Sequence, residues 1–331
     1  MNLLITCPFG LWSLLANELK KIWLTPRDTF QTGTFLTTDM YNMMRINFWS
    51  RLANKVFIEL ASGEAKDFNQ LFNLIKWSAY GQYLSNTKLS LKIQTKNSML
   101  SASRAIQSVA HKALLESIAN FWKEESFTTE LLLSIENNKA HLYLNSSWTA
   151  LYQRGYKTQA WEAPLKENLA VALLLLANRK FKSPLIDPFC WSGTIAIEGA
   201  LLAKNIAPWS RRNFAFEKFK NFEAWTFEKN QARCQSVNLQ KQIYNLCLGY
   251  RHSNDKYCTK QCKTCKYRRY HNFSAKKLFN KQLSCRRKHS NHHQSSLWEK
   301  NQKSEFREHI YEIKRYFWVK YLLRMDQHLF Y

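Results

Sequence analysis

The first 150 residues alternate between short apolar runs and longer amphipathic stretches. The β-branched or alternating runs predict strands, and these are Leu3–Phe9, Thr32–Thr38, Lys55–Gly63 and Lys88–Thr95. A leucine stripe from Leu11 to Leu19 predicts a helix, Asp67 is placed to cap a second, and a third is expected from about Ser103. Residues 131–145 read as a hairpin with a polar turn, so a mixed α+β region is predicted.

The pattern changes after residue 160. An apolar helix is predicted over Ala163–Ala177, followed by a strand at Pro184–Asp187 that is apolar until its last residue and a helix over 195–207. A strand, a tight loop and a helix form the first unit of a doubly wound sheet, whose ligands bind beyond the carboxyl ends of the strands. A dehydrogenase is disfavoured, because no G-x-G-x-x-G follows Ile186.

The loop after this strand, PFCWSGT, is the candidate ligand site. Asp187 ends the strand and Gly193 lies in the turn, where free backbone N–H groups and small residues let a ligand approach the main chain. Such a pattern suits a nucleoside-bearing cofactor. An ordinary strand–helix turn remains the alternative on spacing alone.

Three segments together resemble one known family. LYQRGYKTQAWEAPLKENLAVALLLLA, LIDPFCWSGTIAIEGALLAKNIAP and RNFAFEKF are similar to the THUMP-containing, S-adenosylmethionine-dependent RNA methyltransferases, the branch related to bacterial 23S rRNA guanine-N2 methyltransferases. Members are often labelled N6-adenine-specific DNA methylases. The resemblance runs from residue 1 to about 235.

The resemblance implies a domain order. It places a ferredoxin-like module at 1–55, a THUMP fold that holds structured RNA at 56–152, and the first part of a Rossmann-like methyltransferase domain at 153–240. The fold class is therefore α+β followed by an incomplete α/β domain. Polar and basic residues fall where the THUMP fold faces a phosphate backbone, although a solvated surface role is open for each. These are Lys92, Lys96, Ser98, Ser101, Ser103 and Arg104.

The same resemblance assigns the loop to the methyl donor, S-adenosylmethionine. The residues it implies as donor contacts are Asp187, Pro188, Phe189, Cys190, Ser192, Gly193 and Thr194. Family members carry D-P-F-C-G-S-G-T, and this chain has Trp191 at the first glycine. Glycine serves there because the ligand lies close to the backbone, so we expect an indole to lower donor affinity severely. One base separates a GGG glycine codon from TGG.

The family's catalytic motif is missing. The resemblance calls for N-P-P-Y, which holds and stacks on an extruded base, and this sequence does not contain it. We therefore assign no catalytic residue. The alternatives for this chain are an RNA-binding remnant without catalysis and an adenine-N6 methyltransferase of DNA or RNA.

Residues 241–331 form a basic tail without apolar periodicity. They hold 21 basic and 6 acidic residues, or +15 of the net charge of +25. Cys258, Cys262, Cys265 and His271 offer one zinc reading, but only a single C-x-x-C is present, so no metal is expected. The favoured interpretation of residues 241–331 is that they are translated in a shifted reading frame. Back-translated and moved by one base, 293–300 admits I/T-N-P-P-Y-G-K, and 255–270 admits a helix-like apolar pattern.

These expectations combine into one hypothesis about function. The family activity is methyl transfer to an exocyclic amine of ribosomal RNA, and this chain is an inactive copy whose tail is out of frame and open to protease. A basic chain is consistent with an RNA partner. No run of about 18 apolar residues offers a membrane span and no signal peptide is recognised, so no membrane partner and a cytoplasmic location are expected.

Overall fold

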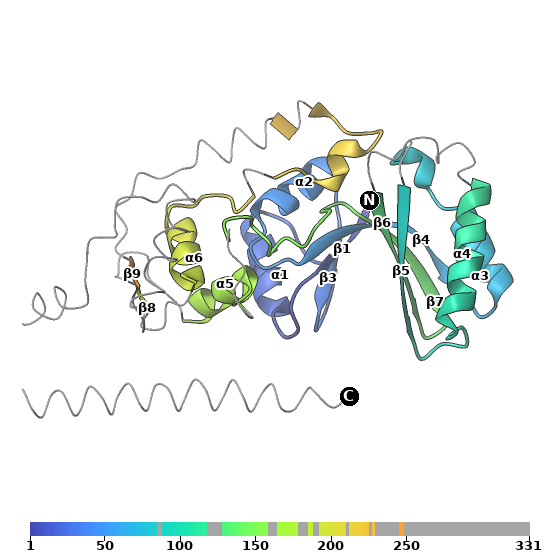
Figure 1. Ribbon diagram of the computed structural model, residues 1–331, viewed down its shortest axis with the longest axis horizontal. Helices are drawn as coiled ribbons and strands as arrows, with labels where there is room; N and C mark the ends of the chain where they lie inside the picture. The colour runs from blue at the N-terminus through green and yellow to red at the C-terminus, as the bar shows by residue number, and fades with distance from the viewer. Residues whose placement is uncertain are drawn as a thin grey trace, which may run out of the picture. The chain divides into compact units, whose positions relative to one another are not determined.

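The computed structural model describes residues 1–84, 88–117, 128–157, 164–177, 185–187, 192–209, 212–224, 227–228 and 245–247, all within the first compact unit of the chain (Figure 1). One sheet with packed helices occupies the first 145 residues, and a short α/β segment follows. Apart from 245–247, the tail predicted to be out of frame lies outside the described residues.

The ferredoxin-like region forms one half of this sheet. β1 (Asn2–Thr6) lies between β3 (Gly33–Thr37) and β4 (Lys55–Glu64), antiparallel to both, and β2 (Asp28–Phe30) pairs with β3. β1 ends three residues before the predicted strand, because the chain turns there and Gly10 takes a φ of 78°. The short β2, which is exposed throughout, has no apolar pattern that could have predicted it.

Two helices cover this half of the sheet. α1 (Trp12–Lys21) buries Leu15 and Leu19, as its leucine stripe predicts. α2 (Met40–Trp49) begins at Asp39, whose Oδ1 accepts the N–H of Asn42 at 2.8 Å. The sequence pattern did not reveal α2, because its buried residues include the polar Asn47 beside methionines and so blur the apolar stripe.

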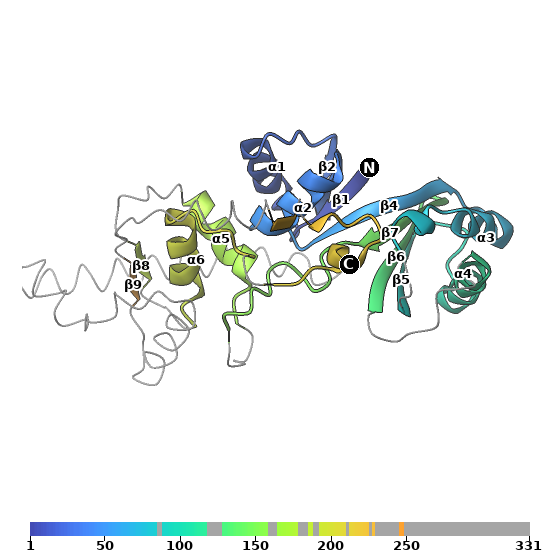
Figure 2. The ribbon, with the colours of Figure 1, turned by 90° about the horizontal axis from the view of Figure 1, so that it is seen from above.

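The ten-residue strand β4 belongs to both halves of the sheet. Its first residues, Lys55–Ile58, pair with β1, and its stretch from Phe57 to Glu64 pairs with β7 (Lys139–Asn145). The register shifts between Glu59 and Ala61, which marks a bulge where the partner changes. Figure 2 shows β4 running from beside β1 to beside β7. The predicted boundary near residue 55 therefore falls at the start of a shared strand.

The second half of the sheet carries two further helices. α3 (Phe68–Lys76) is capped by Asp67 as predicted, and α4 (Ser103–Ser117) packs beside it. β5 (Lys88–Lys96) pairs in parallel with β6 (Thr128–Glu136), which forms the predicted hairpin with β7. Within the described residues the strand order is β2-β3-β1-β4-β7-β6-β5.

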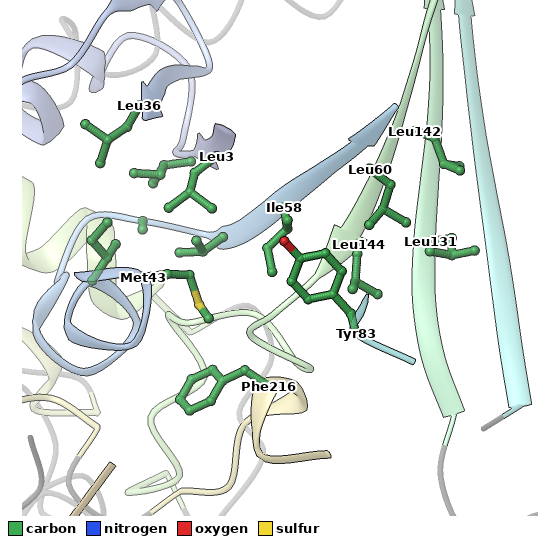
Figure 3. Close-up of a cluster of buried hydrophobic side chains, with 14 of the residues drawn as sticks. Leu3, Leu36, Met43, Ile58, Leu60, Tyr83, Leu131, Leu142, Leu144 and Phe216 are labelled. Atoms are coloured by element: carbon green, nitrogen blue, oxygen red, sulfur yellow. The ribbon is translucent and has the colours of Figure 1, made fainter. Parts of the chain in front are cut away.

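A segment far along the chain completes the core of the N-terminal region. The 3-10 helix η2 (Ala215–Lys218) follows α6 (Thr194–Ala203), and its Phe216 lies in the same buried cluster as residues of both halves of the sheet (Figure 3). The backbone N–H of Phe216 donates to Ser146 O at 3.2 Å, and the ring of Phe219 meets Tyr83, just after η1 (Tyr80–Gln82), edge to face at 5.9 Å. We call residues 214–227, with their five phenylalanines, the aromatic segment.

The α/β segment contains the elements predicted around the ligand loop. α5 (Glu167–Leu176) begins four residues later than predicted, because the chain is extended at Lys166. β8 (Leu185–Asp187) pairs in parallel with β9 (Asn245–Cys247), and α6 (Thr194–Ala203) packs against both strands. None of the described helices combines the length and apolar character needed to cross a lipid bilayer.

A pH-dependent contact lies at the bulge of β4. His141 Nδ1 lies 2.8 Å from Glu59 Oε1, and Asn2 donates to Glu59 Oε2 at 3.0 Å. The hydrogen bond with His141 lowers the pKa of Glu59 against the opposing effect of burial. A carboxylate whose pKa is lowered in the folded protein stabilises the fold at pH values above its pKa in the unfolded chain. That stabilisation is lost as the pH falls through its pKa in the folded protein.

We therefore expect the Glu59→Gln variant to be less stable than the parent by about 1–2 kcal/mol at pH 7. The deficit should disappear as the pH falls below the native pKa of Glu59. Urea unfolding at pH 7 and at acid pH measures both quantities. Glu136→Gln, at a carboxylate exposed by 51%, is the control and should change little at either pH. A deficit that is equal at both pH values would contradict this role for Glu59.

Candidate functional site

The predicted donor loop connects β8 to α6, whose residues are mostly buried. Asp187 is 7% exposed at the end of β8, whose parallel partner is β9. Thr194 is the first residue of α6 and is 2% exposed. This is the strand–loop–helix order in which ligands meet the carboxyl ends of parallel strands. Among the predicted donor contacts, Pro188, Phe189 and Cys190 lie outside the described residues, as does Trp191.

The start of α6 shows why the loop needs a glycine at position 193. Gly193 is the N-cap residue and has a φ of 73°, in the left-handed region that favours glycine. Ser192 and Thr194 flank it, and their hydroxyl oxygens are 2.8 Å apart. The first turn of α6 contains no acidic residue. The positive end of the helix dipole at this turn therefore favours a polar or anionic ligand.

A buried charged cluster lies at the middle of α6. Glu198 is 0% exposed, and its Oε2 lies 2.6 Å from Arg154 Nη1. Tyr156 Oη donates to Glu198 Oε1 at 3.0 Å. Burial raises the pKa of Glu198, and the guanidinium of Arg154 opposes that shift. We call Glu198, Arg154 and Tyr156 the α6 cluster.

The α6 cluster is tied to the ferredoxin-like region. Arg154 Nη2 donates to the backbone carbonyl of Arg51 at 2.8 Å, and Arg51 Nη2 donates to the carbonyl of Ile206 just beyond α6. Glu18 on α1 accepts the backbone N–H of Arg51 at 2.8 Å. These bonds fix the helix that follows the donor loop against the N-terminal region.

α5 is fixed in the same way. Lys157 Nζ lies 3.4 Å from Glu167 Oε1 and donates to Leu165 O at 2.6 Å. Asn168 Nδ2 donates to Asn54 Oδ1 at 2.8 Å, which joins α5 to the residues before β4. Both helices of the α/β segment therefore contact the ferredoxin-like region through polar groups.

Sequence reasoning missed these polar contacts, although one signal was available. Glu198 is the only charged residue within the apolar helix α6, and a lone acid inside such a helix requires a buried partner. Its partner could not be identified from the pattern, because Arg154 is 44 residues away. Arg51 is even more distant from Glu198 in the sequence. Its guanidinium donates to backbone carbonyls, which leave no signature in the sequence.

The predicted RNA contacts divide into two groups. Lys92 and Lys96 lie on β5, where Lys92 pairs with the partly buried Glu130 at 2.8 Å and Lys96 pairs with the exposed Glu136 at 3.0 Å. The other four lie at or near the connection from β5 to α4, and Ser101, Ser103 and Arg104 are exposed there. The fourth, Ser98, donates to Lys96 O at 2.8 Å and accepts the N–H of Asn138 at 3.1 Å.

The residues of this second group precede or begin α4, a 15-residue helix. α4 has no acidic residue in its first turn, so its N-terminus favours a phosphate. Lys96 lies at the end of β5 beside this connection, whereas Lys92 lies four residues earlier along the strand. Lys96 is therefore next in the sequence to the connection that holds the serines and Arg104, whereas Lys92 lies in the middle of β5.

The residues of the alternative zinc reading, Cys258, Cys262, Cys265 and His271, lie outside the described residues. Within the part of the chain that the structure describes, no three His, Cys, Asp or Glu side chains are placed to hold a metal ion. Cys7 lies in the core, where burial raises the pKa of its thiol to about 12. That thiol is therefore not a metal ligand or a nucleophile near neutral pH.

Two family models match the chain. The RlmL ferredoxin-like domain matches residues 2–57, and the RMKL-like methyltransferase domain of UPF0020 matches residues 154–287. The second match begins at Arg154, the first residue of the α6 cluster. It extends beyond residue 240, where the apolar periodicity of the sequence ends.

Curated relatives have similar names. YpsC of Bacillus subtilis, whose name describes an RNA methyltransferase, is 33% identical over 227 residues, which cover 66% of this chain and 59% of YpsC. The ribosomal RNA large subunit methyltransferase K/L of Saccharophagus degradans is 30% identical over 276 residues, which cover 78% of this chain and 36% of that protein. The chain thus spans between about a third and three fifths of the length of these relatives.

Solved structures show the same fold. A predicted N6-adenine-specific DNA methylase from Listeria monocytogenes has a TM-score of 0.76 at 24% identity, covering 80% of this chain and 72% of that one. SMU.472, described as a methyltransferase and crystallised with SAH, has a TM-score of 0.74 at 22% identity, covering 83% and 77%. The fold is that of a ferredoxin-like domain followed by a Rossmann-like methyltransferase domain, and the chain thus combines an RlmL-like ferredoxin domain with an RMKL-like methyltransferase domain.

Proposed function

We propose that this protein descends from an enzyme that transfers a methyl group from S-adenosylmethionine to structured RNA. The observation that carries the proposal is the arrangement around α6. A buried acid ends β8, Gly193 opens the helix in a left-handed conformation, and the α6 cluster anchors the helix to the N-terminal region. The names of the relatives support RNA as the substrate.

We assign each region a part in this function. Residues 1–55 and 56–152 would hold structured RNA, with 56–152 forming the THUMP fold, and residues 153–240 would bind the donor. The target that the family resemblance favours is the N2 amine of a guanine in 23S ribosomal RNA. The exposed basic and serine side chains at the start of α4 support the RNA-binding part, because phosphate contacts position nucleic acid on a protein.

The residues around the donor loop fit the cofactor by the chemistry of their groups. Asp187, Ser192, Gly193 and Thr194 would hold the donor, with the N–H groups of the first turn of α6 facing its polar end. The bound donor supplies an activated methyl group. The protein's contribution is to orient the amine and the methyl group in line and to exclude water, which requires no metal.

We further propose that the chain with tryptophan at position 191 does not carry out this transfer. An indole at the first glycine of the loop would fill space that the donor needs. The N-P-P-Y motif that would hold the target base is also missing from the sequence. What this chain would retain is RNA affinity through its first 150 residues.

Two assays on the same preparation test the proposal. Gel shift with ribosomal RNA measures binding, and transfer of tritium from labelled S-adenosylmethionine measures catalysis. Binding without transfer is the expected result. Transfer by the unmodified chain would refute its inactivity, and the absence of RNA binding would refute the RNA-binding role.

The RNA surface gives a narrower prediction. The double variant Lys96→Ala, Arg104→Ala should weaken binding to all structured RNAs alike, because phosphate contacts carry little sequence information. The slope of log K against log salt should fall by about 1 for each phosphate that the variant no longer neutralises. Gel shifts at salt concentrations from about 50 to about 200 mM measure this slope, because phosphate contacts lose much of their affinity over that range.

Lys66→Ala is the matched control for that experiment. Lys66 is an exposed lysine that also forms a surface ion pair, with Glu64 at 3.0 Å, but it precedes α3 rather than α4. Its removal should leave the salt slope unchanged. An equal loss of affinity in the control would show that total charge matters, rather than this surface.

A further inference from the structure

Two tryptophans have a backbone conformation that tryptophan rarely adopts. Trp23 has a φ of 63° and Trp148 a φ of 71°. The remaining described non-glycine residues with positive φ are all asparagines, which tolerate this region: Asn97, Asn137, Asn138 and Asn205. A bulky side chain is a marked exception there, at a cost of about 1–2 kcal/mol per residue.

Trp23 occupies the position after a helix where glycine is usual. Its N–H donates to Lys20 O at 3.0 Å, and the N–H of Leu24 donates to Leu19 O at 3.1 Å. These two bonds form the Schellman motif, in which the residue that follows the C-cap is usually glycine in a left-handed conformation. The indole of Trp23 is 88% exposed. Little packing therefore offsets the backbone strain.

Trp148 is held in its conformation by neighbouring bonds. Asn145 Nδ2 donates to Trp148 O at 2.8 Å. Arg212 Nη2 donates to Ser147 O at 2.7 Å and to Thr149 O at 2.6 Å, which fixes the main chain on both sides. The fold thus imposes a left-handed residue here whatever its side chain.

The composition of the chain is also low in glycine and high in tryptophan. Glycine averages about 7% of residues, on the order of 23 in a chain of this length, whereas this chain has 8 glycines and 12 tryptophans. Trp209 is unusual for a different reason, which is its hydrogen bonding. It is 1% exposed, and its indole N–H has no acceptor among the residues that the structure describes, although buried indoles usually find one.

We propose that Trp23, Trp148 and Trp191 stand at codons that the cell producing this protein reads as glycine. The codon TGA differs by one base from the glycine codon GGA and from the tryptophan codon TGG. Where TGA is a sense codon, the amino acid inserted depends on the tRNA that reads it. If TGA is translated as tryptophan, the result is the sequence shown above. If TGA is translated as glycine, the residue has the backbone freedom that positions 23 and 148 require.

The consequence for position 191 rests on the proposed function. A glycine at 191 reopens the donor loop, so the protein made in its own cell binds the donor at a site that tryptophan blocks. The left-handed backbone at positions 23 and 148 does not depend on any activity.

The gene and the natural protein provide the test. Codons 23, 148 and 191 should be TGA. Peptides cleaved after lysine and arginine from the protein isolated from its own cells should be lighter by the mass difference between tryptophan and glycine, and these are residues 22–27, 140–154 and 183–204. Trp49, which is helical and packs against the core, is the control and should have TGG and the full tryptophan mass. TGG at codons 23 and 148, or an unchanged peptide mass there, would overturn the proposal.

Stability gives a second readout on the recombinant chain. Trp23→Gly and Trp148→Gly should each raise the Tm by about 2–4 °C, because a glycine relieves the left-handed strain. Trp49→Gly should lower it. A lower Tm in both test variants would count against the assignment. If Trp191→Gly then fails to bind S-adenosylmethionine, the proposed function is at fault and the codon assignment stands.

Discussion

Replacing Arg154 with methionine should lower the free energy of unfolding by about 3–5 kcal/mol, because it leaves a buried carboxylate without its partner. The side chains of Arg154 and Glu198 are 1% and 0% exposed, so water cannot substitute for the missing guanidinium. Arg154 also donates to the carbonyl of Arg51, and that hydrogen bond would be lost as well. Urea unfolding at pH 7 measures the change.

Lys96→Met is the matched control for this variant. Lys96 and Glu136 form an ion pair of similar length, 3.0 Å, but their side chains are 71% and 51% exposed. Such a surface pair contributes about 0–1 kcal/mol. The double variant Arg154→Met, Glu198→Leu should recover part of the stability, because it removes the uncompensated acid. Equal losses in Arg154→Met and Lys96→Met would show that burial does not decide the strength of this pair.

Replacing Trp191 with glycine should raise the affinity for S-adenosylmethionine by about 100-fold, which corresponds to about 2.7 kcal/mol. The reason is steric, because the first glycine of the loop lets the ligand approach the main chain and an indole fills that space. Calorimetric titration of both proteins measures the difference. Methyl transfer should remain absent in both, since neither contains N-P-P-Y.

Trp77→Gly serves as the control for this titration. Trp77 is 79% exposed at the end of α3, so its removal changes the tryptophan count without touching the donor loop. Its affinity for the donor should equal that of the parent. Micromolar binding by the unmodified chain would refute the steric argument directly.

Local patterns revealed most of the fold. The leucine stripe of α1, the cap at Asp67, the alternation along β5 and the polar turn between β6 and β7 each depend on residues within one element, and each appears in the structure as expected. α2 was missed because a buried Asn47, bonded to Ser146 at 3.1 Å, interrupts its apolar face. A polar residue satisfied by a distant partner looks like a surface residue in the sequence.

The contacts between regions could not be predicted for a related reason. RNFAFEKF was recognisable as a family segment, but its aromatic rings pack against Phe48 and Tyr83, more than a hundred residues earlier. The same holds for the α6 cluster, whose acid was visible and whose partners were not. Sequence periodicity shows which face of an element is apolar and says nothing about which element will cover it.

The nucleotide sequence decides whether the tail is translated out of frame. The methyltransferase model matches as far as residue 287, so a single change of frame near codon 240 does not by itself account for the match. We expect the gene to contain an N-P-P-Y-encoding frame downstream of codon 240. Reading all three frames decides this, and the absence of such a frame would remove the out-of-frame hypothesis.

The aromatic segment has a consequence for how the protein is made. During translation the amino-terminal part emerges first and begins to fold alone, yet Phe214, Phe216 and Phe219 belong to the same core as Leu3 and Ile58. Until the ribosome has passed codon 219, the nascent chain exposes the apolar surface that these rings later cover. The growing polypeptide therefore faces an interval of aggregation risk, during which a chaperone would have to shield that surface.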